Sequence, residues 1–519
     1  MHTVDYSACV RLQTFTFKNG WNLEDGIGMR LNALLRKFDS RMNPIAVKEL
    51  RQISRGKFLP VILIGFLFMQ LLVTGAVTFS GSAAPGPELY EALFVWLTVI
   101  CILLIPAYAG FRLAQEHSDM NKDLLFISTL KPVSIVWGKT LSAAVLVALI
   151  YSVCMPFIAM TYILRGVDLL SAFLNIVLSY LFTLTAILVG ILIGCMPANR
   201  FIKGIIGLLG LFLSFFILMR EPILPRLIAE SPANMSFQEA LEAGFRLLWI
   251  WAFPSIGFLL LSAAFVSPPS ANRAFVPRVY LTAVWAASYI AVFVWDQING
   301  DFDLIMWWFV LSFAGFGWAL TVSVSERDEI GLRVRQKIPR LRFQRAFAFL
   351  FYSGSGGGFL WASVGLVMTY LFWSCAFAAS SGGISSEDFL DYLNRFGFAS
   401  LNAWNAAVCA VFIHRKFLRN RVSGAYTWLI AIGVYIISNL LWGIFAVDSE
   451  AYRYFDLIEL LPGIMAIGAA WASENPPTAA AGVIALILGC ACIPWIARQA
   501  AAFKPAPLET RGTQKIGSA

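Results

Sequence analysis

The sequence predicts an all-α polytopic membrane protein, and three observations support this fold class. First, 59% of the 519 residues are hydrophobic and only 13% are charged, which is not the composition of a soluble domain. Second, apolar stretches of about 17–25 residues, each long enough to cross the hydrocarbon core as a helix, alternate with short polar turns. Third, residues 141–163 and 169–193 are apolar on every face, whereas the strands of a membrane barrel alternate apolar and polar positions.

The pattern of apolar stretches and polar breaks predicts about twelve transmembrane helices. The expected spans are residues 58–80, 90–114, 141–164, 169–196, 201–219, 245–266, 279–295, 304–322, 359–379, 397–413, 425–446 and 480–497. A further apolar segment, residues 457–473, is short and is broken by Pro462 and Gly463. We expect that segment to be re-entrant or interfacial.

Lysine and arginine residues predict the orientation. The chain carries 39 of them and a net charge of +9, and nearly all fall on the side of the predicted bundle that holds the N-terminus. The exceptions are Arg165, Arg220, Arg226, Arg246, Arg395 and Arg453. Because cytoplasmic loops collect Lys and Arg, we expect both termini in the cytoplasm and the protein in a bacterial-type inner membrane. This topology explains the net charge without nucleic-acid binding, and the basic faces are expected to contact anionic membrane lipid.

The loop plan divides the chain into five parts. They are a cytoplasmic N-terminal extension at 1–42, an amphipathic elbow helix at 43–57, a first six-helix half at 58–278, a second six-helix half at 279–497 and a cytoplasmic tail at 498–519. In each half the largest cytoplasmic loop lies between the second and third helices, at 115–140 and 323–358. Two halves related by parallel duplication would produce this plan, although their residue-level similarity is weak.

The segment before the first span predicts a helix in the cytoplasmic interface. Asn43 is a typical N-cap residue and Pro44 suits the first helical position. An apolar stripe is expected on one face of this candidate elbow helix: Ala46, Leu50 and Ile53. The charged residues are expected to face elsewhere: Lys48, Glu49 and Arg51. Taken alone, such a helix is most often a passive anchor.

The first large cytoplasmic loop, residues 115–132, is a candidate docking site for a partner protein. It begins with charged residues that suit a cytoplasmic contact: Glu116, Asp119, Lys122 and Asp123. A short apolar run follows, which is costly in water unless something covers it. Its members are Leu124, Leu125 and Phe126. The alternative is that this apolar turn packs under the protein's own helices.

The order of two segments resembles a known family. The stretch NPIAVKELRQ from Asn43, and then DLLFISTLKPVSIVWGKTLSA from Asp123, are together similar to the permease subunits of ATP-binding-cassette (ABC) transporters in the type-2 (ABC-2) export class. In that family an elbow helix precedes the first span, and a coupling helix ends in a proline turn before a glycine–lysine pair. The resemblance covers residues 43–166 and, more loosely, residues 473–489. The chain departs from the family in its twelve expected spans, where many relatives have six, and in its first 42 residues, so Met42 is a candidate start.

This resemblance implies a non-catalytic, membrane-spanning permease subunit of an export system, powered by a separate ABC ATPase chain. The ATPase is expected to dock on residues 115–132 and on residues 323–345. If the two halves are true repeats, one chain supplies both membrane domains; if they are not, a second permease chain is expected as a partner. The sequence does not indicate the transported substrate.

Other motifs give little support to catalysis on this chain. Gly138-Lys139-Thr140 ends like a phosphate-binding loop, but position 133 is Val and no strand precedes it, so no cofactor is expected. Only three histidines occur, without an H-E-x-x-H pattern, and neither a metal site nor a hydrolytic site is predicted. A membrane-embedded transferase that uses Glu88 and Glu91 is a weak alternative. The glycine cluster at 354–358 predicts a hinge or close helix packing.

A secondary transporter is the main alternative, because twelve helices in two halves is also its common plan. Carriers coupled to protons or sodium usually place ionisable groups within the bundle. Here the span centres offer mainly amides: Asn175, Asn402, Asn405 and Asn439. The scarcity of charge in the spans favours a permease that is powered by another chain.

Overall fold

A computed structural model of the chain describes fourteen stretches and omits the rest. They are residues 43–79, 85–118, 131–164, 169–196, 198–199, 201–208, 210, 237–268, 270–299, 302–328, 330–379, 386–418, 423–445 and 478–505. Every regular element in these stretches is helical, as the composition predicts. The predicted extension at 1–42 lies outside them, as does most of the predicted tail.

The helices follow one another with short connections. They are α2 (Pro44–Arg55), α3 (Phe58–Phe79), α4 (Pro85–Val99), the π-helical turn η2 (Ile100–Leu104), α5 (Ile105–Ser118), α7 (Pro132–Ile163), α8 (Leu169–Cys195), α11 (Phe237–Val266), α12 (Phe275–Asn299), α13 (Asp303–Ser323), α14 (Leu332–Arg335), α15 (Arg342–Phe351), α16 (Ser355–Ala379), α17 (Ser386–Ile413), η4 (His414–Leu418), η5 (Gly424–Tyr426), α18 (Thr427–Phe445) and α20 (Thr478–Ala502).

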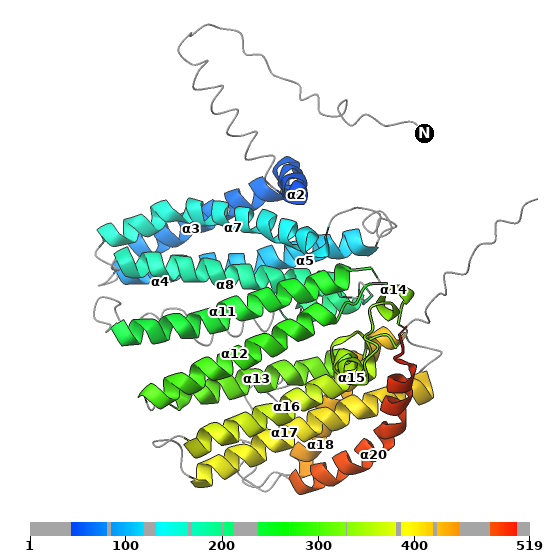
Figure 1. The fold of residues 1–519 in the computed structure, drawn as a ribbon. Helices are drawn as coiled ribbons and strands as arrows, with labels where there is room; N and C mark the ends of the chain where they lie inside the picture. The colour runs from blue at the N-terminus through cyan, green and yellow to red at the C-terminus, as the bar shows by residue number, and fades with distance from the viewer. Residues whose placement is uncertain are drawn as a thin grey trace, which may run out of the picture.

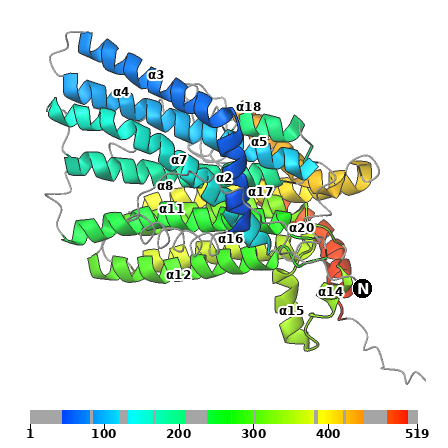
Figure 2. The same cartoon turned by 90° about the horizontal axis from the view of Figure 1, so that it is seen from above.

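The long helices run side by side, and two short ones lie across them. Figure 1 shows α2, the end of α5, α14, α15 and the end of α20 gathered at one end of the bundle. In Figure 2 both α2 and α15 run roughly crosswise to the long helices at that end. The predicted loops at 115–132 and 323–345 therefore leave the bundle at the same end as α2.

Nine helices in the described stretches are long and apolar enough to cross a membrane, and two shorter apolar helices cover Trp251–Val266 and Thr427–Asn439. The protein is therefore a multi-pass helical membrane protein. The expected count of twelve stays a prediction, because residues 201–219 are described only in part. The segment at 457–473 lies outside the described residues.

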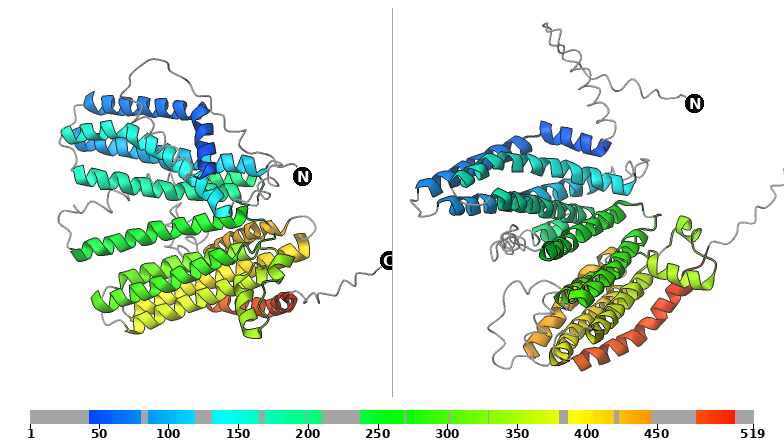
Figure 3. Two further views of the ribbon diagram at one scale, coloured as in Figure 1. Left: turned by 45° about the horizontal axis from the view of Figure 1, so that its top comes forward. Right: turned by 60° about the vertical axis from the view of Figure 1, so that its left-hand side comes forward.

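Buried apolar side chains form two large clusters. One extends from Ile53 to Val266 and the other from Val292 to Trp495, and Figure 3 shows the corresponding helices in two groups. The groups meet at α11 and α12, where the Tyr280 hydroxyl donates to the Phe253 carbonyl at 2.9 Å. Because α12 begins at Phe275, the predicted boundary between residues 278 and 279 falls inside a helix. The duplication of the halves stays a prediction.

Glycines allow α5 and α8 to approach at backbone distance. A Cβ atom placed on Gly110 would overlap the Gly190 carbonyl group, and one on Gly190 would overlap the Pro106 carbonyl. Gly194 is equally close to the Gly110 carbonyl oxygen. Small residues are the usual solution for tight helix pairs in lipid, because packing replaces the missing hydrophobic drive. This contact fixes α5, and with it the start of the loop at 115–132.

Candidate functional site: two ionic junctions at one end of the bundle

The helix expected before the first span is present as α2. Asn43 caps it, since the Asn43 side chain accepts a hydrogen bond from the Ile45 amide at 3.0 Å, and Pro44 occupies the first helical position. The helix ends at Arg55, and Gly56 has an extended backbone. The chain then turns sharply into α3, which places α2 across the end of the bundle (Figure 2).

The inward face of α2 differs from the expected one. Ala46, Glu49 and Ile53 are buried, whereas Leu50 is half-buried. The prediction that Glu49 faces away with the other charges is wrong, because its carboxylate finds two cations in the interior. Lys48 and Arg51 are exposed, as expected.

Glu49 binds α2 to two different helices. Its Oε1 atom lies 2.7 Å from the Lys139 ammonium on α7, and its Oε2 atom lies 3.4 Å from Arg112 Nε on α5. Only 3% of Glu49 is exposed. A carboxylate withdrawn from water in this way requires counter-charge, and here two cations share it.

Two further contacts hold α2 against α7. The Asn43 side-chain amide donates to the Ser134 carbonyl at 2.5 Å and to the Ser134 hydroxyl at 3.2 Å. A Cβ atom on Gly138 would lie 2.9 Å from the Ile45 Cβ, so a larger residue there would push the two helices apart. We call Asn43, Glu49, Arg112, Ser134 and Lys139 the elbow junction.

The elbow junction surrounds both ends of the candidate docking loop. The chain leaves α5 at Ser118, six residues after Arg112, and re-enters α7 at Pro132 with Lys131 as the N-cap residue. Glu116 lies on α5, although its side chain is not described. The remaining candidate docking residues lie outside the described stretches: Asp119, Lys122, Asp123, Leu124, Leu125 and Phe126.

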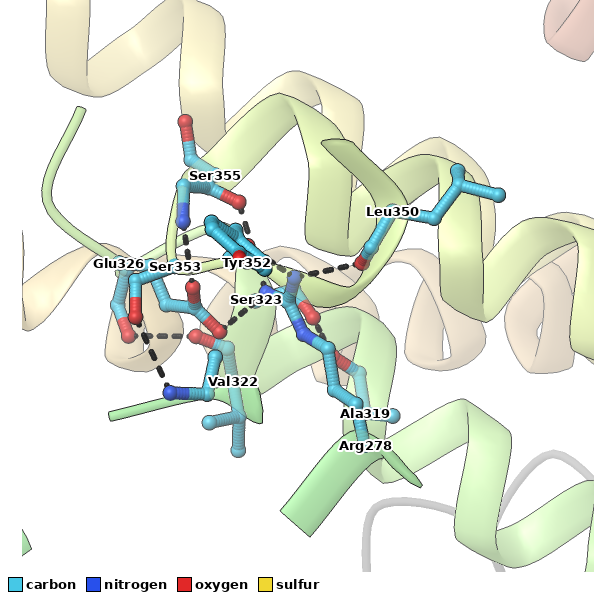
Figure 4. A network of polar contacts seen from close by, with 12 residues as sticks. Arg278, Ala319, Val322, Ser323, Glu326, Leu350, Tyr352, Ser353 and Ser355 are labelled. Atoms are coloured by element: carbon cyan, nitrogen blue, oxygen red, sulfur yellow. Dashed lines mark hydrogen bonds and ion pairs between the residues drawn. The ribbon is translucent and has the colours of Figure 1, made fainter. Parts of the chain in front are cut away.

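A second junction forms around Arg278, which is 3% exposed. Its Nη1 atom donates to the Leu350 carbonyl at 2.8 Å and to the Tyr352 carbonyl at 2.7 Å. Its Nη2 atom lies 2.5 Å from Glu326 Oε1. The other Glu326 oxygen accepts from the Gly354 amide at 2.9 Å. As Figure 4 shows, one guanidinium thus connects the start of α12, the end of α13 and the turn between α15 and α16.

Asp328 extends this junction to the last described helix. One carboxylate oxygen lies 2.6 Å from an Arg415 nitrogen, and the other accepts from Gln499 at 2.6 Å and from the Ser355 hydroxyl. Gln499 in turn accepts from the Gly356 amide at 2.6 Å. We call Arg278, Glu326, Asp328, Arg415 and Gln499 the Arg278 junction.

The glycine cluster at the start of α16 supports close packing, which was one of the two expected roles. A Cβ atom on Gly357 would overlap the Phe349 carbonyl, and one on Gly358 would overlap the Arg278 guanidinium. Gly356 has the same relation to Gln499. These glycines allow α15 and α16 to fold tightly around the Arg278 junction.

Arg273 lies in the turn between α11 and α12, next to the Arg278 junction. Burial and, to a lesser extent, the Arg327 cation lower the pKa of Arg273. The unperturbed pKa of a guanidinium lies so far above neutral that Arg273 keeps its charge at pH 7. Its side chain donates to the Ser267 carbonyl and so closes the turn.

The polar groups inside the bundle pair with one another. The Tyr151 hydroxyl lies 2.7 Å from the Ser179 hydroxyl, and Asn402 donates to Asn439 at 2.9 Å. Within the described residues no three His, Cys, Asp or Glu side chains lie close enough together to hold a metal ion. The strongest described charge clusters therefore lie at the end of the bundle.

Sequence reasoning found α2, the start of α7 and the glycine cluster, but it missed Arg112, Arg278 and Glu326 as partners. Arg112 was noticed only as a charge near a span end. A signal was available, because a charge next to an apolar span is unusual and needs a partner. The identity of that partner depends on residues far away in the sequence.

No family model, curated protein or solved structure matches the chain. The argument for a function therefore rests on the residues and their arrangement.

Proposed function

We propose that this protein is the membrane-spanning permease subunit of an ABC-type export system, powered by a separate ATPase subunit and located in a bacterial-type inner membrane with both termini in the cytoplasm. The observation that carries the proposal is the elbow junction. It joins a helix lying across the bundle to the two helices that flank residues 115–132.

The elbow junction gives a mechanical reason for this assignment. A partner that moves the loop at 115–132 acts directly on the ends of α5 and α7. Because Glu49 pairs with Arg112 on α5 and with Lys139 on α7, α2 moves with both helices. α7 continues without a break from Pro132 to Ile163, so displacement at its start reaches the opposite side of the membrane. Coupling of this kind requires contiguous, well-packed elements.

The distribution of charge supports an external energy source. Carriers driven by ion gradients usually use ionisable groups within the bundle. In the described helices, the charged side chains of the two junctions lie at one end, and the paired polar groups deeper in the bundle include Tyr151 with Ser179 and Asn402 with Asn439. ATP hydrolysis is assigned to the partner chain, since Gly138, Lys139 and Thr140 lie inside α7 and Lys139 pairs with Glu49.

Co-expression with the ABC ATPase encoded next to this chain tests the proposal. We expect the two proteins to co-purify and the permease to stimulate ATP hydrolysis. The variant with Leu125→Asp and Phe126→Asp should insert normally but lose both properties, because the new charges would be buried without partners at the contact.

The matched control carries Ile163→Asp and Leu164→Asp, the same change in charge at the opposite end of α7. Size-exclusion profiles in detergent verify that both variants fold. If the folded loop variant keeps normal ATPase binding and stimulation, the docking proposal is wrong. A gene without a neighbouring ABC ATPase would favour the secondary transporter.

A further inference from the structure

The helix α15 has an unusual surface for its position. It is only ten residues long, yet Phe343 is 75% exposed and Phe347 is 52% exposed. It lies between α13, which ends at Ser323, and α16, which begins at Ser355. Because both neighbours are candidate membrane spans, α15 lies at the depth of a membrane boundary. Exposed aromatic side chains at that depth are typical of helices that contact lipid.

A groove runs between α15, α16 and α20. It has a volume of about 590 Å³, and its apolar lining includes Phe347, Leu350, Leu360 and Phe503. The open side of the groove borders the membrane-facing surface of α15. An elongated apolar group fits this lining better than a polar solute does.

Two arginines stand at the groove and have no acidic partner. Arg342 and Arg345 both line it, and among the described residues neither guanidinium forms an ion pair. Arg345 makes one hydrogen bond, to the Arg340 carbonyl at 3.2 Å. The nearby carboxylates are already occupied, since Glu326 pairs with Arg278 and Asp328 with Arg415. Guanidinium groups are the preferred protein partners of phosphate oxygens.

We propose that this groove binds an anionic phospholipid. The phosphate lies between Arg342 and Arg345, and an acyl chain lies along Phe347, Leu360 and Phe503. The lipid covers apolar surface that the protein itself leaves open and supplies the negative charge that the two arginines lack. The site does not depend on the ATPase partner, so its test is independent of the proposed export function.

The test uses the full-length protein in a neutral detergent. Phosphatidylglycerol or phosphatidylcholine with identical acyl chains is added, and native mass spectrometry counts the lipids retained. We expect preferential retention of phosphatidylglycerol, unaffected by excess inorganic phosphate. The variant Arg342→Gln with Arg345→Gln should reduce that retention by roughly tenfold, as expected for the loss of charge-assisted hydrogen bonds. The control Arg333→Gln with Arg335→Gln removes the same charge from exposed positions outside the groove and should retain the lipid.

A second pair of variants tests the apolar part of the site without changing charge. Ala500→Trp fills the groove and should reduce retention, whereas Ala501→Trp changes a neighbouring exposed residue that does not line the groove. Equal retention of the two lipids would overturn the proposal. So would equal losses in the two arginine pairs, equal retention in the two tryptophan variants, or displacement of the lipid by inorganic phosphate.

Discussion

The Lys139 ammonium lies 2.7 Å from the Glu49 carboxylate, although 90 positions separate the two residues in the sequence. The contact fastens a helix that lies across the bundle to the start of one that spans it. With Arg112 at 3.4 Å on the other carboxylate oxygen, the arrangement joins α2, α5 and α7 at a single buried group. Any motion of the loop between α5 and α7 therefore includes α2.

We predict that Glu49→Gln destabilises the protein. The substitution leaves two largely buried cations without counter-charge, which typically costs about 3–5 kcal/mol. The free energy of unfolding in detergent measures the loss. Lys48→Gln, an exposed position on the same helix, is the control and should change that free energy by less than about 0.5 kcal/mol. The double variant Glu49→Gln with Lys139→Gln should be less destabilised than the sum of the two single variants, and strict additivity would contradict the pairing.

Replacement of Gly190 by Leu is expected to separate α5 from α8. The new side chain would overlap the carbonyl of Pro106, and a backbone contact cannot relax without moving a helix. The predicted result is a lower thermal unfolding temperature and poor recovery of folded protein. Gly65→Leu on α3 is the matched control, because nothing lies within 4 Å of a Cβ atom at that glycine. Similar losses in both variants would show that any change of glycine in a span is harmful.

The Arg278 junction makes a prediction about the second group of helices. Arg278→Met removes a buried cation and leaves Glu326 and the Leu350 and Tyr352 carbonyls without their donor, so we expect a loss of about 3–5 kcal/mol. Arg278→Lys should recover only part of it, because an ammonium cannot reproduce the planar fork. Arg333→Met at an exposed position serves as the control. Unfolding measurements that rank Lys equal to Arg would contradict the role of the fork.

Reporter fusions test the proposed orientation. Fusions after Ser270, Arg340 and Lys504 should give a cytoplasmic signal, since these positions lie at the end of the bundle that carries α2 and α15. A fusion after Asn299, at the other end of α12, should give an external signal. The physical reason is the excess of basic residues in the loops at the first end. An external signal after Arg340 would contradict the orientation and remove the cytoplasmic ATPase contact with it.

The sequence by itself determined the class of the protein and several element ends. Its apolar stretches are long enough to span a membrane, and this property needs no knowledge of neighbours. Asn43 with Pro44, and Pro132, mark the starts of α2 and α7, because capping and proline restriction act within a few residues. The crowding of the glycine cluster was also foreseen as one of two alternatives.

Only the tertiary structure decided how these helices are joined. Periodicity placed Glu49 with the outward charges of α2, but the carboxylate turns inward because Lys139 and Arg112 lie within reach. Arg278 and Glu326 pair with each other at a distance of 48 positions, and two carbonyls of another turn complete the set. Local sequence patterns report the environment of a residue along one helix, whereas a buried charge is stabilised by whichever groups the fold brings around it.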